Sequence, residues 1–333
     1  MKKIVFRADG NSISGLGHLY RIFALMEMCK DDFECLLLTR EDSAVTVIPS
    51  SYACLHIPAV ISLEHEPAWI RQQFDPEATL IIADGYHFDS NYQQKLKNLH
   101  FKLVFIDDMA QGNVYADLII NHSPSASESL YNKSNGTKLA LGTGFSMVRP
   151  LFLKAAALAR KTENMDTAFV CFGGSDPFEL TDFVCKTLIT IKQVKKINVV
   201  VGGAFKSLGI FNLADQYNNI HIHQNLSEAE LLKVMQESDF AVAPTSTILF
   251  ELCCVKMPVL TGYYVDNQKE AYEAFLNEKA VAGAGNFKEL SALELEKLVQ
   301  DLLNADNSKM LQKQAELFDG KQKDRIIKIL NTL

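Results

Sequence analysis

Short apolar runs alternate with longer amphipathic stretches along the whole chain. In the first half the apolar runs predict strands, and the stretches at 17–30 and about 88–98 predict helices. The predicted strands of this half cover residues 3–7, 35–39, 79–85, 102–108, 117–121 and 139–142. Two of them, LIIAD and LVFID, are continuously apolar and end in aspartate. This is typical of buried parallel strands whose carboxyl ends open on a site.

The pattern changes over residues 147–166, where a predicted helix runs into a polar stretch suited to a linker. A second alternating series follows. Its predicted strands cover 168–172, 197–203, 219–223, 240–244, 258–264 and 280–284. Its predicted helices cover about 177–192, 227–238, 246–256, 267–279, 289–304 and 307–332. The two series predict an α/β protein with two doubly wound, Rossmann-like domains, 1–148 and 149–333, and a ligand in the cleft between them. The last helix is a candidate to pack back on the first domain.

Composition narrows the class of protein. A chain of 333 residues favours two domains, and a net charge of −7 argues against nucleic acid as the main partner. The seven cysteines include no C-x-x-C pair, and several lie in apolar runs, which indicates buried thiols in a reducing compartment. The apolar start is interrupted at Arg7, and no later run approaches a membrane span in length. We therefore expect a cytoplasmic protein without membrane insertion.

A glycine-rich turn joins the first predicted strand to the first predicted helix, in the stretch FRADGNSISGLGHLYR. Gly15 and Gly17 would let an anion approach the free backbone N–H groups of the helix start. The positive potential there favours a neutral imidazole at His18, which can accept a proton, and Asp9 is a candidate to orient its other nitrogen. The simpler alternative is a tight turn with a capping histidine.

The same stretch resembles the opening signature of the UDP-2,4-diacetamido-2,4,6-trideoxy-β-L-altropyranose hydrolases of pseudaminic acid biosynthesis. The shared frame, F-R-x-D followed by G-x-G-H-x-x-R, is matched by Phe6, Arg7, Asp9, Gly15, Gly17, His18 and Arg21. Later family blocks are matched by DGYH, FIDD, LIIN, GFSMVRPLF, CFGGSDP, PTSTILFEL and DNQ. The resemblance covers about residues 3–275.

The resemblance implies a GT-B architecture, like that of the glycosyltransferase that completes lipid II. It also implies metal-independent hydrolysis of a UDP-sugar to UDP and free sugar, with no cofactor and with other sugar-pathway enzymes as functional partners. In this family frame His18 is the general base, Asp9 and Tyr86 support it, and Leu16 and Arg21 join the two glycines in substrate binding. The associated processes are polysaccharide biosynthesis and flagellin glycosylation.

Two stretches of the second half carry candidate nucleotide-binding groups. Gly173, Gly174 and Ser175 suit a phosphate or ribose, although Asp176 and Pro177 could equally start a helix after an ordinary turn. Ser246 and Thr247 begin a predicted helix and suit a diphosphate. By the resemblance, Glu251 binds the ribose hydroxyls. Family members often carry glycine or alanine at Pro244 and Thr245, and asparagine or tryptophan at Phe250.

Several alternatives stay open. Asn267 and Gln268 suit acetamido and hydroxyl groups of a sugar, or simply begin a helix capped by Asp266. His122 follows a strand end without an assigned role, and Asp107 with Asp108 could form a glycosidase-like pair. The main rival function is a GT-B glycosyltransferase in which His18 deprotonates an acceptor hydroxyl. A UDP-sugar-binding regulator and a 2-epimerase are lesser alternatives.

Overall fold

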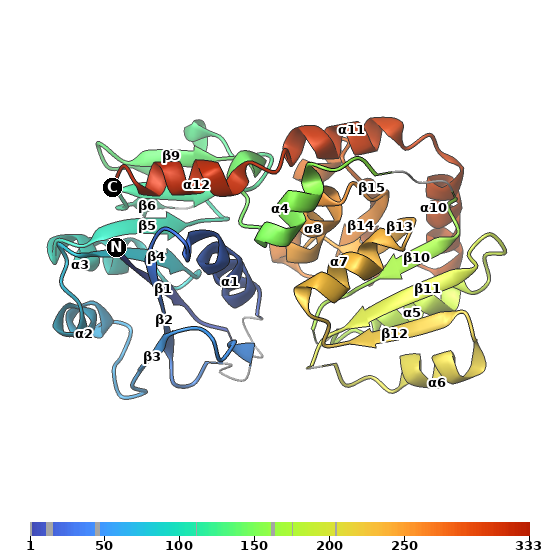
Figure 1. Cartoon of the computed structure of the whole chain (residues 1–333), viewed down its shortest axis with the longest axis horizontal. Helices are drawn as coiled ribbons and strands as arrows, with labels where there is room; N and C mark the ends of the chain where they lie inside the picture. The colour runs from blue at the N-terminus through green and yellow to red at the C-terminus, as the bar shows by residue number, and fades with distance from the viewer. Residues whose placement is uncertain are drawn as a thin grey trace. The chain divides into compact units, whose positions relative to one another are not determined.

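The computed structural model describes residues 2–10, 16–43, 47–110, 112–160, 164–174, 176–203 and 205–333. The chain divides into two compact units (Figure 1). Unit 1 comprises Met1–Pro150 with Lys321–Leu333, and unit 2 comprises Leu151–Gly320. Each unit is built on one parallel sheet covered by helices on both faces. The predicted α/β organisation with two doubly wound domains is confirmed.

The sheet of unit 1 has seven parallel strands. In spatial order they are β3 (Cys54–Ile57), β2 (Glu34–Arg40), β1 (Lys3–Ala8), β4 (Thr79–Asp84), β5 (Lys102–Ile106), β7 (Leu118–Asn121) and β9 (Lys138–Leu141). A separate pair joins β6 (Asn113–Val114) to β8 (Asn132–Lys133). The chain runs from β1 outward to β3 and then returns to the other side of β1 at β4. The strand order therefore reverses between β1 and β4, and open α/β sheets commonly bind ligands at the carboxyl ends of the strands at such a reversal.

Helices bury both faces of this sheet. Helix α1 (Gly17–Cys29) packs against β1, while α2 (Glu66–Gln73) and α3 (Ser90–Asn98) cover the opposite face. Val5 and Ile81 of the strands share that second core with Ile70 of α2 and Leu96 of α3. Strand β3 and helix α2 were not predicted. The buried face of α2 includes the charged Glu66, so its apolar periodicity is weak.

The sheet of unit 2 has six parallel strands. In spatial order they are β12 (Ile220–Gln224), β11 (Lys196–Val201), β10 (Thr167–Val170), β13 (Phe240–Pro244), β14 (Val259–Tyr263) and β15 (Ala282–Asn286). The order reverses between β10 and β13. The helices of this unit are α4 (Pro150–Ala156), α5 (Leu180–Leu188), α6 (Gly209–Gln216), α7 (Glu228–Gln236), α8 (Thr247–Cys254), α9 (Lys269–Asn277), α10 (Ala292–Asn304) and α11 (Ser308–Leu317). Ser227 and Glu230 form a capping box at the start of α7.

The prediction of a single helix over 307–332 is wrong, because the helix is interrupted near Gly320 and forms two separate helices. Gly320 adopts φ +78°, and a Cβ atom there would lie 2.7 Å from the Leu153 carbonyl oxygen. Helix α11 therefore stays in unit 2, and α12 (Gln322–Leu330) belongs to unit 1. There Gln322 Nε2 donates to the Thr143 carbonyl at 3.4 Å, and α12 runs beside β9 (Figure 1).

All seven cysteines lie in the described part of the chain and are free thiols. Five are buried and two are half-buried, in line with the expectation of reduced thiols: Cys29, Cys171, Cys185, Cys253 and Cys254, and then Cys35 and Cys54. Among the described residues, none of the helices combines the length and the apolar character that crossing a membrane requires.

Candidate active site

Four strands of unit 1 deliver charged or polar side chains to the carboxyl edge of the sheet. Asp84 ends β4, and Ala8 of β1 lies opposite it in the register. The residues that end or follow these strands are Asp9, Asp84, Asp108 and His122. His18 reaches the same edge from the second position of α1. The carboxyl ends of parallel strands thus gather these groups at the point where the strand order reverses.

His18 and Asp84 form a hydrogen-bonded pair. His18 Nδ1 lies 2.7 Å from Asp84 Oδ1, His18 is 8% exposed and Asp84 is fully buried. Burial by itself would raise the pKa of Asp84, but the Arg21 guanidinium and the His18 hydrogen bond outweigh it and hold this pKa at about 2. An ionised carboxylate only accepts hydrogen bonds, so we assign the ring hydrogen to Nδ1. His18 Nε2 is then the acceptor, as a general base requires.

Arg21 holds Asp84 in place. It lies one helical turn after His18, is 6% exposed, and donates through Nε and Nη2 to Asp84 at 2.7 and 2.5 Å. Its Nη1 donates to Asp108 at 2.6 Å. The bidentate pair fixes the carboxylate that orients the imidazole. The sequence predicted Arg21 as a substrate-binding residue. In the structure its guanidinium binds the carboxylates of Asp84 and Asp108.

Tyr86 lies against the imidazole of His18. The two ring centroids are 4.7 Å apart with planes at 81°, an edge-to-face contact. Tyr86 remains 51% exposed, whereas His18 is almost covered. The end of β4 supplies the carboxylate that orients His18, and the loop that follows it supplies an aromatic ring beside the imidazole.

The adjacent carboxylates Asp107 and Asp108 serve different neighbours. Asp107 accepts hydrogen bonds from the backbone N–H groups of Met109 and Ala110 at 2.9 and 3.0 Å, while Asp108 pairs with Arg21. This separation disfavours the glycosidase-like pair. His122 lies beside Arg21, with 3.5 Å between Nε2 and Nη1. Burial and then the Arg21 charge lower the pKa of His122 to about 4, so it is uncharged at neutral pH.

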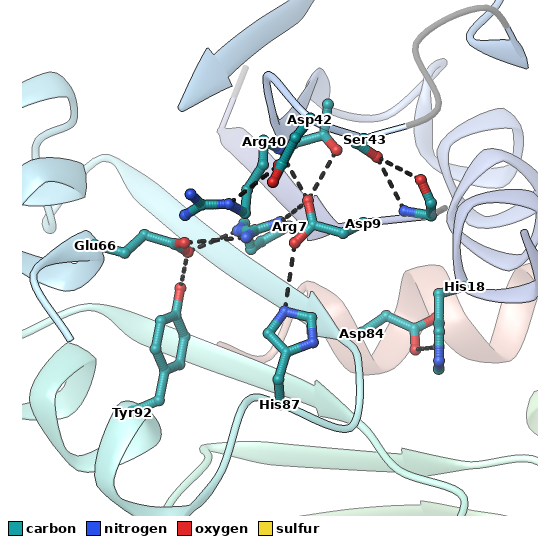
Figure 2. A network of polar contacts seen from close by, with 12 residues as sticks. Arg7, Asp9, His18, Arg40, Asp42, Ser43, Glu66, Asp84, His87 and Tyr92 are labelled. Carbon is teal, nitrogen blue, oxygen red and sulfur yellow. Dashed lines mark hydrogen bonds and ion pairs between the residues drawn. The ribbon is translucent and has the colours of Figure 1, made fainter. Parts of the chain in front are cut away.

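Asp9 does not occupy the place beside His18 that the sequence suggested for it. Its Oδ1 accepts hydrogen bonds from Thr39 Oγ1 at 3.0 Å and from the Arg40 backbone at 2.9 Å (Figure 2). Arg7 Nη1 pairs with the same oxygen at 2.7 Å, and His87 Nε2 lies 3.4 Å from Oδ2. Asp9 turns toward β2, whereas Asp84 ends the strand on the other side of β1. The carboxylate that contacts the second ring nitrogen of His18 is therefore that of Asp84 and not that of Asp9.

The glycine-rich turn of unit 1 is only partly described. Gly15 lies outside the described residues, Leu16 precedes the helix and Gly17 is its first residue. A Cβ atom built on Gly17 would meet no other described atom within 4 Å. Among the described residues, none packs against the Gly17 backbone at this helix start.

The second glycine turn follows β10 in unit 2, and Ser175 lies outside the described residues. Gly173 adopts φ +89°, and a Cβ atom on Gly202 would lie 2.7 Å from the Gly174 Cα atom. Asp176 accepts hydrogen bonds from Leu180 N and Thr181 N at 3.0 and 2.7 Å, so its side chain caps α5. Helix α5 begins at Leu180, not at 177, because Asp176 and Glu179 adopt positive φ angles of 39° and 53°.

Helix α8 begins at the carboxyl end of β13, next to the strand-order reversal of unit 2. Ser246 and Thr247 are half-buried at its start, and Glu251 is buried one turn further on. Thr245 and Phe250, two residues that differ from the family pattern, are both buried. Thr245 Oγ1 lies 3.2 Å from Thr261 Oγ1, and Phe250 packs edge-to-face in a cluster with two phenylalanines, Phe275 and Phe318.

The remaining predicted residues lie after β14. Asn267 is exposed, while Gln268 is half-buried and its Oε1 accepts a hydrogen bond from the Tyr264 backbone at 3.1 Å. Phe178, which the sequence did not single out, is 47% exposed and contacts the Tyr264 ring edge-to-face. Lys288 Nζ lies 4.8 Å from the centroid of the Phe178 ring. Across the described positions, no group of three or more His, Cys, Asp or Glu side chains has the arrangement of a metal site.

Three curated proteins are similar in sequence, while no protein-family model matches the chain. The chain is 25% identical over 291 residues to uncharacterized protein MJ1062 of Methanocaldococcus jannaschii, covering 83% of the chain but only 58% of that protein. It is 26% identical over 274 residues to the UDP-2,4-diacetamido-2,4,6-trideoxy-β-L-altropyranose hydrolase of Campylobacter jejuni, covering 80% and 93%. It is 21% identical over 286 residues to the spore coat polysaccharide biosynthesis protein SpsG of Bacillus subtilis, covering 84% and 82%.

Solved structures show the fold. MurG of Acinetobacter baumannii matches with a TM-score of 0.66 at 10% identity, covering 100% of both chains. The spinosyn rhamnosyltransferase SpnG, complexed with thymidine diphosphate, matches with a TM-score of 0.65 at 12% identity, covering 99% and 100%. The expected GT-B architecture is confirmed. The chain is thus a GT-B-fold protein related in sequence to the UDP-2,4-diacetamido-2,4,6-trideoxy-β-L-altropyranose hydrolases, as its opening signature predicted.

Proposed function

We propose that the chain acts on UDP-sugars in sugar biosynthesis, and specifically that it hydrolyses a UDP-activated diacetamido-trideoxy sugar to UDP and free sugar. The relationship to the Campylobacter hydrolase over 80% of the chain supports this reaction. The reaction would supply the free sugar for nonulosonic (pseudaminic) acid biosynthesis, without a metal ion.

The His18–Asp84 pair carries the proposal. With Asp84 accepting from Nδ1, His18 Nε2 takes a proton from water, and the resulting hydroxide oxygen bonds to the anomeric carbon. The bond from that carbon to the UDP oxygen breaks, and its electron pair leaves with UDP. Asp84 stabilises the imidazolium that forms, in the way that the aspartate of a catalytic triad does. Tyr86 borders the reacting centre.

In unit 1 the glycine turn, and in unit 2 the glycine turn with the start of α8, carry the proposed substrate-binding groups. A diphosphate is favoured where backbone N–H groups and a helix dipole point outward, and a buried carboxylate at Glu251 suits two ribose hydroxyls. The proposed binding residues are Gly15, Leu16, Gly17, Gly173, Gly174, Ser175, Ser246, Thr247, Glu251, Asn267 and Gln268. Arg21 joins this function as a positioning residue for Asp84.

A panel of UDP-sugars incubated with the protein in water tests the proposal. Release of UDP together with free sugar, followed by NMR, is the expected result for a diacetamido-trideoxy donor. His18→Ala and His18→Asn should lower turnover by at least the 10²–10⁴-fold that general base assistance contributes, and should leave UDP affinity intact. Near-normal turnover in both variants would remove His18 from the role of base.

A GT-B glycosyltransferase is the second candidate, favoured by the fold it shares with a rhamnosyltransferase. In that reaction His18 would deprotonate an acceptor hydroxyl instead of water. The same NMR experiment separates the two functions. A UDP-sugar that stays intact in water, and is consumed only when an acceptor is added, would favour the transferase over the hydrolase.

A further inference from the structure

A second histidine–aspartate pair lies on the same edge of unit 1 as His18 and Asp84. His87 Nε2 lies 3.4 Å from Asp9 Oδ2, and the His87 side chain keeps 41% of its surface exposed (Figure 2). Asp9 follows β1 and His87 belongs to the loop that follows β4, the two strands between which the order reverses. The proposed function leaves this pair without a part in proton transfer.

Asp9 is held rigidly by a buried network of charges. Arg7 is fully buried and pairs with Asp9 at 2.7 Å through Nη1, and with both oxygens of Glu66 at 2.6 and 3.0 Å. Tyr92 donates its hydroxyl to Glu66 at 2.5 Å. Burial would raise the pKa of Asp9, but the neighbouring His87 and Arg7 side chains hold it far below its usual range. Asp9 is therefore a fixed, ionised acceptor.

The backbone of the loop keeps the His87 ring close to Asp9. The ring packs on Phe88 with 4.0 Å between centroids. A Cβ atom on Gly85 would lie 2.9 Å from His87 Cε1, so a side chain at position 85 would push the ring away. The ring is thus placed by a buried aromatic residue on one side and by a required glycine on the other.

The two histidines of this edge carry opposite tautomers. An ionised Asp9 can only accept, so in a neutral His87 ring the hydrogen lies on Nε2, 3.4 Å from Asp9 Oδ2, and Nδ1 is the acceptor. In His18 the hydrogen is on Nδ1. Tyr86, the immediate neighbour of His87, touches the His18 ring. His87 follows Tyr86 directly in the loop after β4, so the backbone places the two side chains about 3.8 Å apart at their Cα atoms.

We propose that His87 is a sugar-binding residue whose Nδ1 accepts a hydrogen bond from an N–H or O–H group of the substrate sugar, with Asp9 as its positioning residue. This inference rests on the proposed function, because it requires a UDP-sugar beside His18. The chemical class that it selects is a pyranose carrying a hydrogen-bond donor, either an acetamido N–H or a hydroxyl. His87 contributes affinity for the sugar and takes no part in activating water.

Two amide substitutions of His87 form a matched test. The amide of His87→Asn reaches the Nδ1 position, whereas that of His87→Gln reaches the Nε2 position and its contact with Asp9. Binding is measured by calorimetry in the His18→Ala background with UDP and with the diacetamido UDP-sugar. His87→Gln and His87→Ala should weaken UDP-sugar binding about 10-fold, the value of one lost hydrogen bond, with UDP binding unchanged. His87→Asn should retain more of the sugar affinity, and Asp9→Asn should show the same selective loss.

The donor group is identified with a UDP-sugar that carries hydrogen atoms in place of both acetamido groups. If the effect of His87→Gln persists, the donor is a hydroxyl; if it disappears, the donor is an acetamido N–H. Equal UDP-sugar affinity in all His87 variants, while wild type still cleaves the substrate, overturns the inference and leaves the proposed function standing. Failure of wild type to bind or cleave any UDP-sugar overturns both.

Discussion

The carboxylate of Asp84 lies 2.7 Å from His18 Nδ1 and also accepts two hydrogen bonds from Arg21. One buried anion thus orients the imidazole and neutralises the guanidinium one helical turn away. Since Arg21 pairs with Asp108 as well, the orientation of His18 depends on side chains from β4, α1 and the turn after β5. A substitution of any of these side chains is expected to alter the orientation of the His18 imidazole.

Replacing Asp84 with asparagine should abolish most turnover while UDP still binds. The amide can donate to His18 Nδ1, which favours the tautomer with hydrogen on Nε2, and it cannot stabilise the imidazolium. We expect kcat to fall by about 10²–10⁴, comparable to the loss of a general base. Steady-state UDP release and calorimetry of UDP binding measure the two effects. Retention of wild-type kcat would show that Asp84 has no part in orienting the base.

The same variant should unfold more easily. Asp84→Asn leaves Arg21 with one anionic partner in a buried site, and breaking a buried ion pair costs about 3–5 kcal/mol. Urea unfolding of the variant beside wild type gives the difference. Asp42→Asn is the matched control, since Asp42 is exposed and pairs with Arg40 at 3.3 Å. Its free energy of unfolding should change by less than about 1 kcal/mol.

Arg21→Lys separates a positioning role from a substrate-binding role. Lysine keeps the charge but cannot make the bidentate contact with Asp84 while also reaching Asp108. We expect kcat to fall at least about 10-fold, with KM for the UDP-sugar nearly unchanged. A large rise in KM with an unchanged kcat would instead assign Arg21 to substrate binding.

Gly202→Ala should disturb the glycine turn of unit 2. The added methyl group would lie 2.7 Å from Gly174 Cα, a backbone atom that cannot rotate away. We expect a loss of about 1–3 kcal/mol in unfolding free energy and weaker UDP binding. Gly144→Ala is the control, because its nearest neighbour would be an arginine side chain at 3.7 Å, an ordinary contact. Equal UDP affinity in the Gly202 and Gly144 variants would separate this turn from the nucleotide site.

Acid should destabilise unit 1 over a defined range. The pKa of Asp84 is about 2 in the folded protein and 3.8 as its ordinary value, so the folded state favours the ionised form. Its contribution, about 2 kcal/mol, is complete above the ordinary value and is lost as pH falls through about 2. Asp9 and Asp108 are shifted in the same direction. Urea unfolding from pH 6 to pH 2 should show falling stability below about pH 4, and a flat profile would contradict the assignment.

The sequence by itself determined the order of most strands and helices, the two-unit α/β organisation and the start of α1 at Gly17 beside His18. These features follow from local causes: continuous apolar runs make buried parallel strands, and a glycine turn admits a helix start. The apolar periodicity that predicts an element is weak where a charged side chain lies on its buried face. Helix α2, with Glu66 on its inner face, escaped detection for that reason.

Only the tertiary structure decided which carboxylate meets His18. Asp9 and Asp84 both follow apolar strands, and their distance along the chain carries no information about the side of β1 on which each lies. The reversal of strand order places β2 on one side of β1 and β4 on the other, so Asp9 meets Thr39 and Asp84 meets His18. The break at Gly320 likewise depends on the approach of Leu153, a contact across more than 160 residues. Pairing between distant segments is set by sheet topology, which local periodicity does not encode.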